Sequence, residues 1–425
     1  MANTLEVKRG EPSTLYRWIV LIFISLAMFG NYYIYDSIAP IADILKEQLN
    51  FSDKDIGSLN SVYSIAAVLI LLIGGIIIDK YGTKKSVLIF GSICTLAAFV
   101  TMLSPKLGVM LTGRVLLGLG AEPLIVAITT ALAKWFKGKE LSFAFGINLT
   151  IARLGSVAAD WSPSWGKAFY TGWQPPLKVA ALVGIFCVVG GIIYYFLESY
   201  SEKHHKLGRA GEMDKLVFGD LFKFNTSFWF IVALCVTFYS AIFPFRTFAI
   251  KFFQEAHGVT RDVAGPLNSV LPMAALVVTP LFGLLVDKIG KRAQLMMIGS
   301  VLLIPVYLMM VYSNISLYIP IALMGISFSL IPAVMWPSVA YIVKESRLGT
   351  AYAVMTLIQQ IGVAGFNWLI GFANDYSSAS AQNPEGYRMG MWMFSILGFL
   401  GVFFAYMLKR TDDKHGGRLE SPARD

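Results

Sequence analysis

Twelve runs of about twenty apolar residues follow one another along this chain and restrict the folds that it can adopt. A helix of about 20 residues crosses the hydrocarbon core of a bilayer, whereas a membrane β-barrel shows alternating segments of about ten residues. Only 14% of the residues are charged, against about a quarter in soluble domains. We therefore predict an all-α polytopic membrane protein with twelve transmembrane helices, at 16–38, 56–78, 85–103, 108–133, 141–161, 178–197, 227–250, 265–286, 293–313, 316–341, 349–372 and 390–408.

One long polar segment, 198–226, separates the first six runs from the last six. The predicted domains are an N-terminal tail, a six-helix bundle, a linker, a second six-helix bundle and a C-terminal tail, at 1–15, 16–197, 198–226, 227–408 and 409–425. The closing stretch GGRLESPARD is polar and is expected to be unstructured.

The distribution of lysine and arginine predicts the topology. Of the 35 such residues, 24 fall in segments on the side of the two termini, eight fall on the opposite side, and three lie inside spans. Loops rich in Lys and Arg stay in the cytoplasm, so both termini are predicted to be cytoplasmic. The net charge of +9 is then explained by topology and by contact with the lipid bilayer, and we expect no nucleic-acid partner.

Two opposite charges lie near the middle of successive runs. Glu122, in the segment GLGAEPL, precedes the end of the fourth run by about 12 residues, and Arg153 follows the start of the fifth by about 12. Successive spans are antiparallel, and a helix rises 1.5 Å per residue, so both charges are predicted at a similar depth. A charge at the bilayer centre costs at least roughly 3 kcal/mol and usually has a function. The pair could bind a substrate that carries both charges, or the two groups could neutralise each other.

The frame Gly-x-x-x-Asp-Lys-x-Gly occurs once in each half, from Gly75 after the second run and from Gly283 after the eighth. The glycines permit a tight turn. We assign the charged residues of both copies to gating rather than to substrate binding: Asp79, Lys84, Lys85, Asp287, Lys291 and Arg292.

This repeat resembles the cytoplasmic loop signature of the major facilitator superfamily. The resemblance implies two six-helix bundles related by an axis along the membrane normal. The segment Arg114-x-x-x-Gly118-x-Gly120 is similar to an arginine motif of the same superfamily. We assign Arg114 a structural or gating role in preference to substrate contact.

Further segments cover most of the runs: Tyr35-Asp36, GLGAEPL, KWFKGKE at 134–140, ARLGS at 152–156, FPF at 243–245, NSV at 268–270, 280–291, WP at 336–337, LGTAY at 348–352 and QQ at 359–360. They resemble the dipeptide-transporting branch of the superfamily, with lysosomal members in animals and bacterial relatives. The resemblance implies that Glu122 meets the amino end of a peptide and that Arg153 meets its carboxylate. The resemblance implies an N-terminal sorting extension in the animal members. We expect this chain to depart from that pattern in starting almost directly at its first span, and in Arg246, an additional buried cation.

The chemistry of the pair suits a zwitterion, because each end of a dipeptide needs a partner in a dry site. An arginine fork can hold a carboxylate in a bidentate manner. Asp36 and Arg246, toward the outer ends of their spans, are expected either to close an external gate or to contact the ends of the peptide. Further cavity-lining candidates are polar or aromatic: Tyr32, Tyr33, Tyr63, Phe243, Trp336, Gln359, Gln360 and Asn367.

The sequence thus favours a dipeptide transporter that works by alternating access, and it leaves uniport and proton coupling open. An alternative is a carrier of small organic anions, such as dicarboxylates or sugar phosphates, that uses Arg153 and Arg246; a non-transporting scaffold is a third. We expect no enzyme, no cofactor and no metal site, since no nucleophile–base set or ligand cluster stands out. A monomer in a bacterial inner membrane is the expected setting.

Overall fold

The structure, a computed structural model, describes residues 11–136, 140–205, 207, 224–344, 347–414, 417 and 419–422. Parts of the predicted tails and linker, and residues 137–139 of the KWFKGKE segment, lie outside these ranges. The main helices are α1 Thr14–Asp36, α2 Ala42–Leu49, α3 Asp53–Met102, α4 Leu107–Phe136, α5 Leu141–Trp165, α6 Gln174–His204, α7 Thr226–His257, α8 Arg261–Ile289, α9 Arg292–Tyr312, α10 Tyr318–Ile342, α11 Leu348–Tyr376 and α12 Tyr387–Lys414. Short 3₁₀ turns are found at Ala39–Ile41, Lys167–Thr171 and Pro384–Gly386.

The predicted all-helical membrane class is confirmed. Among the described residues, eleven segments are long and apolar enough to span a membrane. Helix α3 contains two of them, Asp53–Leu71 and Ile73–Met102, which overlap the second and third predicted spans. Gly82, where φ is +76° and a side chain would be strained, lies within Ile73–Met102. Helix α5, which carries the fifth predicted span, is not among the eleven.

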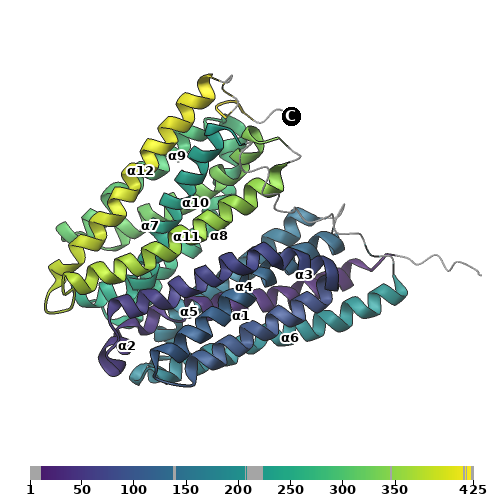
Figure 1. Ribbon diagram of the computed structural model, residues 1–425, viewed down its shortest axis with the longest axis horizontal. Coiled ribbons are helices and arrows are strands. Elements are labelled where there is room, and N and C mark those ends of the chain that lie inside the picture. The colour runs from purple at the N-terminus through teal and green to yellow at the C-terminus, as the bar shows by residue number, and fades with distance from the viewer. Residues whose placement is uncertain are drawn as a thin grey trace, which may run out of the picture.

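The helices form two groups, α1–α6 and α7–α12 (Figure 1). Within the first, α3 packs on α4 and α6, and α1 packs on α5 and α6. Within the second, α12 packs on α7 and α9, and α10 packs on α8 and α9. The two halves meet mainly through α3 with α11 and α5 with α8. Each half therefore has its own packing, and the seam between them is made by two helix pairs.

The halves are close at one end of the molecule and diverge toward the other (Figure 1). The close end carries α2 and the α7–α8 connection, and we call it the outer end, following the predicted topology. The opposite, inner end carries Gly82 and the α8–α9 connection. At the outer end a Cβ on Gly57 would lie 2.1 Å from the Asn367 carbonyl oxygen, so only glycine permits this approach of α3 to α11. The structure is thus closed at its outer end.

Candidate functional site

A cavity of about 270 Å³ lies between the halves, near the lower end of the range for small-molecule sites, roughly 300–1,000 Å³. Helices α1, α3, α4 and α5 of the first half and α7, α10 and α11 of the second line it. Ten of the site residues predicted from the sequence are on its wall: Tyr32, Asp36, Tyr63, Glu122, Arg153, Phe243, Arg246, Trp336, Gln359 and Gln360. Sequence reasoning missed several polar neighbours, namely Asn31, Ser156, Tyr239 and Thr356.

Glu122 is placed by close packing of α4 on α3. Gly118, one turn earlier on the same face of α4, would bring a Cβ to 2.3 Å from the Tyr63 carbonyl oxygen. The resulting approach lets the Tyr63 hydroxyl donate to Glu122 Oε1 at 3.0 Å. Gln360 Nε2 of α11 donates to the same oxygen at 3.0 Å. Oε2 accepts no hydrogen bond from the described residues and is not enclosed, so it faces the cavity.

Arg153 contributes a guanidinium that makes neither a hydrogen bond nor an ion pair with any residue that the structure describes. Its nearest polarisable neighbours are two aromatic rings. The guanidinium carbon lies 5.5 Å from the ring centre of Tyr32 and 5.8 Å from that of Phe328. Cation–π attraction of this kind is worth about 0.5–2 kcal/mol. The two rings therefore hold the guanidinium in place without using its N–H donors.

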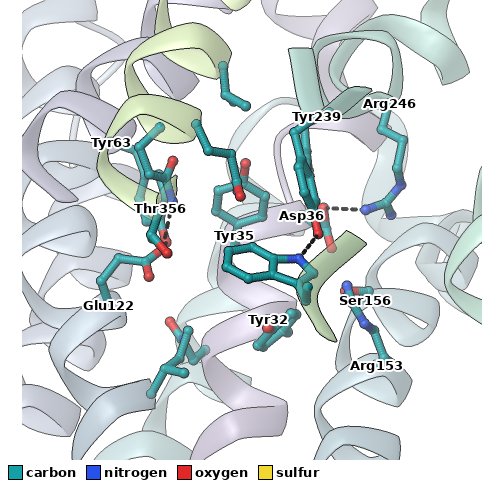
Figure 2. A pocket seen from close by; sticks show the side chains of 17 residues that line it. Tyr32, Tyr35, Asp36, Tyr63, Glu122, Arg153, Ser156, Tyr239, Arg246 and Thr356 are labelled. Atoms are coloured by element: carbon teal, nitrogen blue, oxygen red, sulfur yellow. Dashed lines mark hydrogen bonds and ion pairs between the residues drawn. The ribbon is translucent and has the colours of Figure 1, made fainter. Parts of the chain in front are cut away.

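Glu122 and Arg153 point into the cavity from opposite sides (Figure 2). No ion pair joins them within the described part of the chain, so the structure does not show the mutual neutralisation that the sequence left open. The arrangement is one anionic oxygen and one cationic fork that face a common space.

Arg246 is engaged differently. Its Nη1 lies 3.3 Å from Asp36 Oδ1, and its Nη2 lies 2.9 Å from Asp160 Oδ2. Asn268 donates to the other Asp160 oxygen at 2.8 Å. Arg246 is 4% exposed and Asp160 is fully buried. This cluster joins α7 and α8 of the second half to α1 and α5 of the first.

Two further ion pairs at the outer end were not predicted. Lys251, counted as a loop cation from the sequence, is fully buried in α7 and lies 2.8 Å from Asp53 Oδ2. Arg261 holds Asp43 with two bonds, of 2.9 and 2.5 Å. In these pairs, as in the Arg246 cluster, the cation belongs to the second half and the acid to the first. The outer end is therefore closed by complementary charge as well as by close packing.

Three predicted residues lie behind the cavity wall. Arg114 is fully buried and donates to the carbonyl oxygens of Leu59, Ile34 and Tyr35 and to Asn60 Oδ1. Tyr33 packs in a small apolar cluster with Ala159 and Ala180. Asn367 is fully buried; its Oδ1 accepts from the Thr247 hydroxyl at 2.8 Å and its Nδ2 donates to the Val363 carbonyl oxygen. The structure does not bring Tyr33 or Asn367 to the cavity, because both side chains point into helix seams.

The charged residues of the first gating loop contact only their own half or solvent. Lys84 pairs with Glu202 Oε2 at 2.5 Å, and the Thr83 hydroxyl donates to Glu198 at 2.8 Å. Asp79 and Lys85 are exposed. In the second loop, Asp287 and Lys291 are exposed, and Asp287 lies 3.8 Å from Arg292. Among the described residues, no bond joins either loop to the opposite half, as expected when the inner end is open.

The C-terminal tail folds against the second gating loop, so the expectation of an unstructured end is wrong for 417 and 419–422. Leu419 is fully buried. The Lys291 amide donates to the Glu420 carbonyl oxygen at 3.1 Å, and Arg292 Nη1 donates to that of Ser421 at 2.7 Å. Glu420 Oε1 accepts from the Ala293 amide at 3.1 Å and caps α9. Burial raises the pKa of the Glu420 carboxyl.

In the part of the chain that the structure describes, no group of three His, Cys, Asp or Glu side chains is placed to hold a metal ion. Cys94, Cys187 and Cys235 are buried free thiols.

A family model described as Major Facilitator Superfamily matches residues 24–260 and 247–424. The lysosomal dipeptide transporter MFSD1 of Danio rerio is 33% identical over 365 residues, which cover 82% of this chain and 79% of the relative. The protein of the same name from Homo sapiens is 30% identical over 434 residues, with 97% and 90% covered. The hexuronate transporter of Escherichia coli (strain K12) is more distant, at 24% over 179 residues, which cover 42% of this chain and 41% of that one.

Solved structures share the fold at low sequence identity. A bacterial homologue of the human lysosomal transporter Spinster, in an inward-facing and unoccupied conformation, superposes with a TM-score of 0.74 at 17% identity, covering 97% of this chain and all of that one. The nucleoside transporter NupG gives a TM-score of 0.71 at 16% identity, with 92% and 98% covered. These two likenesses concern the fold alone.

Proposed function

The chain belongs to the major facilitator superfamily, in the branch of the lysosomal dipeptide transporter MFSD1, and from this premise we propose that it moves dipeptides by alternating access. It is a multi-pass membrane transporter. The dipeptide as substrate is the part that we propose, on the basis of the site together with relatives about 30% identical.

The observation that carries the proposal is the pair of unsatisfied charges in one cavity. Glu122 Oε2 has no donor, and the Arg153 fork has no acceptor, within the described residues. An isolated charge in a poorly hydrated site is costly until a partner reaches it. A zwitterion supplies both partners at once: its ammonium donates to Glu122, and its carboxylate accepts from Arg153 in the fork geometry that a guanidinium favours. The site is thereby complementary to a peptide with two free ends.

The charges around the cavity balance. Three acids, Asp36, Glu122 and Asp160, accompany three arginines, Arg114, Arg153 and Arg246. A zwitterion leaves this balance unchanged, so we propose uniport without a compensating proton. A small organic anion would add uncompensated negative charge. Its expected second clamp, Arg246, already serves two carboxylates, and these contacts favour the dipeptide over the anion.

We extend the proposal to the setting of the transporter. The inner end is assigned to the cytoplasm, supported by the 24 of 35 lysines and arginines on the side of the termini. The structure then corresponds to an inward-open state of a monomer in a bacterial cell membrane. Single cysteines at the exposed positions Lys106 (outer) and Lys80 (inner), probed with an impermeant thiol reagent on intact cells, test this assignment. Labelling of position 80 but not of 106 would reverse it.

The substrate is tested with purified protein and with proteoliposomes. Dipeptides are expected to raise the melting temperature and to exchange across the membrane in counterflow, whereas single amino acids and dicarboxylates are not. Stabilisation by organic anions but not by dipeptides would reject the proposal. Glu122→Gln is expected to weaken dipeptides more than their N-acetyl analogues, because only the free amine uses the carboxylate. Equal losses for both would remove Glu122 from amine binding.

A further inference from the structure

Each of the two charged groups in the cavity is held by two neutral side chains, one from each half of the molecule. Glu122 is held by Tyr63 of its own half and by Gln360 of the opposite half. Arg153 is held by Tyr32 of its own half and by Phe328 of the opposite half. This parallel arrangement concerns residues that lie far apart in the sequence, on α10 and α11 of the second half and on α1, α3, α4 and α5 of the first.

At Glu122, both donors occupy the same carboxylate oxygen. The Tyr63 hydroxyl and the Gln360 amide each lie 3.0 Å from Oε1. With Oε1 fixed twice, rotation of the carboxylate is restricted, and Oε2 is presented to the cavity. Gln359, the neighbouring amide on the same wall, takes no part: its Oε1 accepts from the Cys235 thiol at 3.5 Å. Orientation of the carboxylate thus depends on one specific amide of α11.

At Arg153, aromatic rings replace ionic partners. Phe328 is 4% exposed and is itself fixed by other rings, stacking on Phe238 at 6.3 Å and meeting Phe243 edge-on at 6.4 Å. A rigid ring face attracts a guanidinium without using its N–H donors. The fork therefore stays in position with all of its donors available to a carboxylate.

We propose that Gln360 and Phe328 are positioning residues, which orient the amine-binding and carboxylate-binding groups of the first half only while the second half stands as it does in this outer-closed structure. This inference rests on the proposed function. A rearrangement that moves α11 away from α4 removes the Gln360 bond from Glu122. One that moves α10 away from α5 removes the Phe328 ring from Arg153. Peptide affinity then changes with the relative position of the halves, which gives the transporter a means of coupling conformation to binding and release.

Three ligands separate the two roles: a free dipeptide, its N-acetyl derivative, which lacks the ammonium, and its carboxamide, which lacks the carboxylate. Dissociation constants are measured by calorimetry on the full chain, with displacement titrations for the weaker ligands. Gln360→Ala is expected to raise Kd about tenfold for the dipeptide and the carboxamide, since a hydrogen bond to a charged group is lost. The N-acetyl derivative should bind as it does to the parent.

Phe328→Leu is expected to show the complementary pattern. Loss of one cation–π contact raises Kd about threefold for the dipeptide and the N-acetyl derivative, and it leaves the carboxamide unchanged. Phe328→Met removes the ring while keeping most of the apolar volume; it should give the same pattern and serves if the leucine variant does not fold.

Matched controls remove similar groups elsewhere. Gln254→Ala deletes an amide of α7 that donates to the Ile250 carbonyl oxygen away from the cavity, and Phe394→Leu deletes a buried ring of the second half that packs on Phe245 and Tyr307; neither should discriminate among the ligands. Equal weakening of all three ligands by Gln360→Ala or Phe328→Leu would overturn the positioning role.

Two reference variants distinguish this failure from failure of the proposed function. If Glu122→Gln and Arg153→Gln are ligand-selective but the positioning variants are not, only this inference falls. If neither reference variant discriminates among the ligands, the dipeptide proposal itself falls.

Discussion

Replacing Arg246 by glutamine removes the one cation that two carboxylates of the first half share at the outer end. Asp36 and Asp160 would then face each other's charge in a seam where Asp160 is fully buried and Asp36 is 8% exposed. In an outer-open state both carboxylates would gain water. The substitution should therefore destabilise the outer-closed state more than the outer-open one.

The size of the shift follows from the burial. Breaking one partner of a buried ion pair costs about 3–5 kcal/mol, largely through the charge left unpaired. At the lower value, the ratio of outer-closed to outer-open molecules falls about 150-fold, since about 1.4 kcal/mol corresponds to tenfold. Neutralising all three groups, in Asp36→Asn/Asp160→Asn/Arg246→Gln, removes the unpaired charge and should restore most of the ratio.

Pulsed electron spin resonance measures the shift directly. Spin labels at Lys106 and Ser316 report across the outer end, and labels at Lys80 and Lys288 report across the inner end; all four positions are exposed. The native cysteines are buried. Arg246→Gln should lengthen the outer distance and shorten the inner one. An unchanged outer distance in a folded Arg246→Gln protein would refute the role of this cluster in closure.

Three further predictions concern packing and the tail. Gly118→Ala should lower the melting temperature and weaken dipeptide binding, because the added methyl group pushes α4 away from α3; we expect a loss of stability of about 1–3 kcal/mol. Gly108→Ala, whose Cβ meets nothing within 4 Å, should do neither. Equal effects of the two substitutions would contradict the packing argument. Leu419→Asp should lower the melting temperature through a buried charge, and the exposed Pro422→Asp should not; an unaffected Leu419→Asp would mean that the tail does not dock. Glu420→Gln should raise the melting temperature at pH 7 but not at pH 4. Because the pKa of Glu420 is raised in the folded protein, the folded state binds this proton more tightly than the unfolded state does, and the ionised carboxylate lowers stability once the pH exceeds the ordinary pKa of a glutamate. A lower melting temperature at pH 7 would reverse that sign.

The helices were predictable from the sequence because apolar runs of this length have one solution in a bilayer. The turn at Gly82 was also accessible, since the repeated Gly-Asp-Gly frame marks both gating loops. Depth counting placed Glu122 and Arg153 on the same cavity. These predictions need only local pattern and helix geometry.

The partners of the charged residues were not accessible, because they depend on how the two halves stand relative to each other. Gln360 was predicted to line the cavity, but its bond to Glu122 joins residues 238 positions apart. Phe328 reads as one more apolar residue of its run. No local rule sets the register of α11 against α4 or of α10 against α5, and so their contacts with the two charges were missed.

Lys251 was misplaced for a different reason. The apolar pattern ends near 250, and a lysine at that point resembles a loop residue, whereas α7 continues to His257. The continuation is stabilised by contacts from other segments: Asp53, Glu255 and Tyr387 all lie within 3.2 Å of the Lys251 ammonium. The tail was missed likewise, since Leu419 is a single apolar residue in a polar stretch. Its backbone is held by Arg292 of α9 and Asp412 of α12, which the sequence does not reveal as neighbours.

An experimentally determined structure of the chain with a bound dipeptide tests the central claim most directly. The ammonium nitrogen is predicted within hydrogen-bonding distance, about 2.7–3.2 Å, of Glu122 Oε2, and the carboxylate oxygens are predicted at the same range from the Arg153 fork. Gln360 should still donate to Oε1. A peptide bound with its ends reversed or outside the cavity, or an Arg153 fork turned onto a carboxylate of the protein, would contradict the claim that these two groups bind the ends of the substrate.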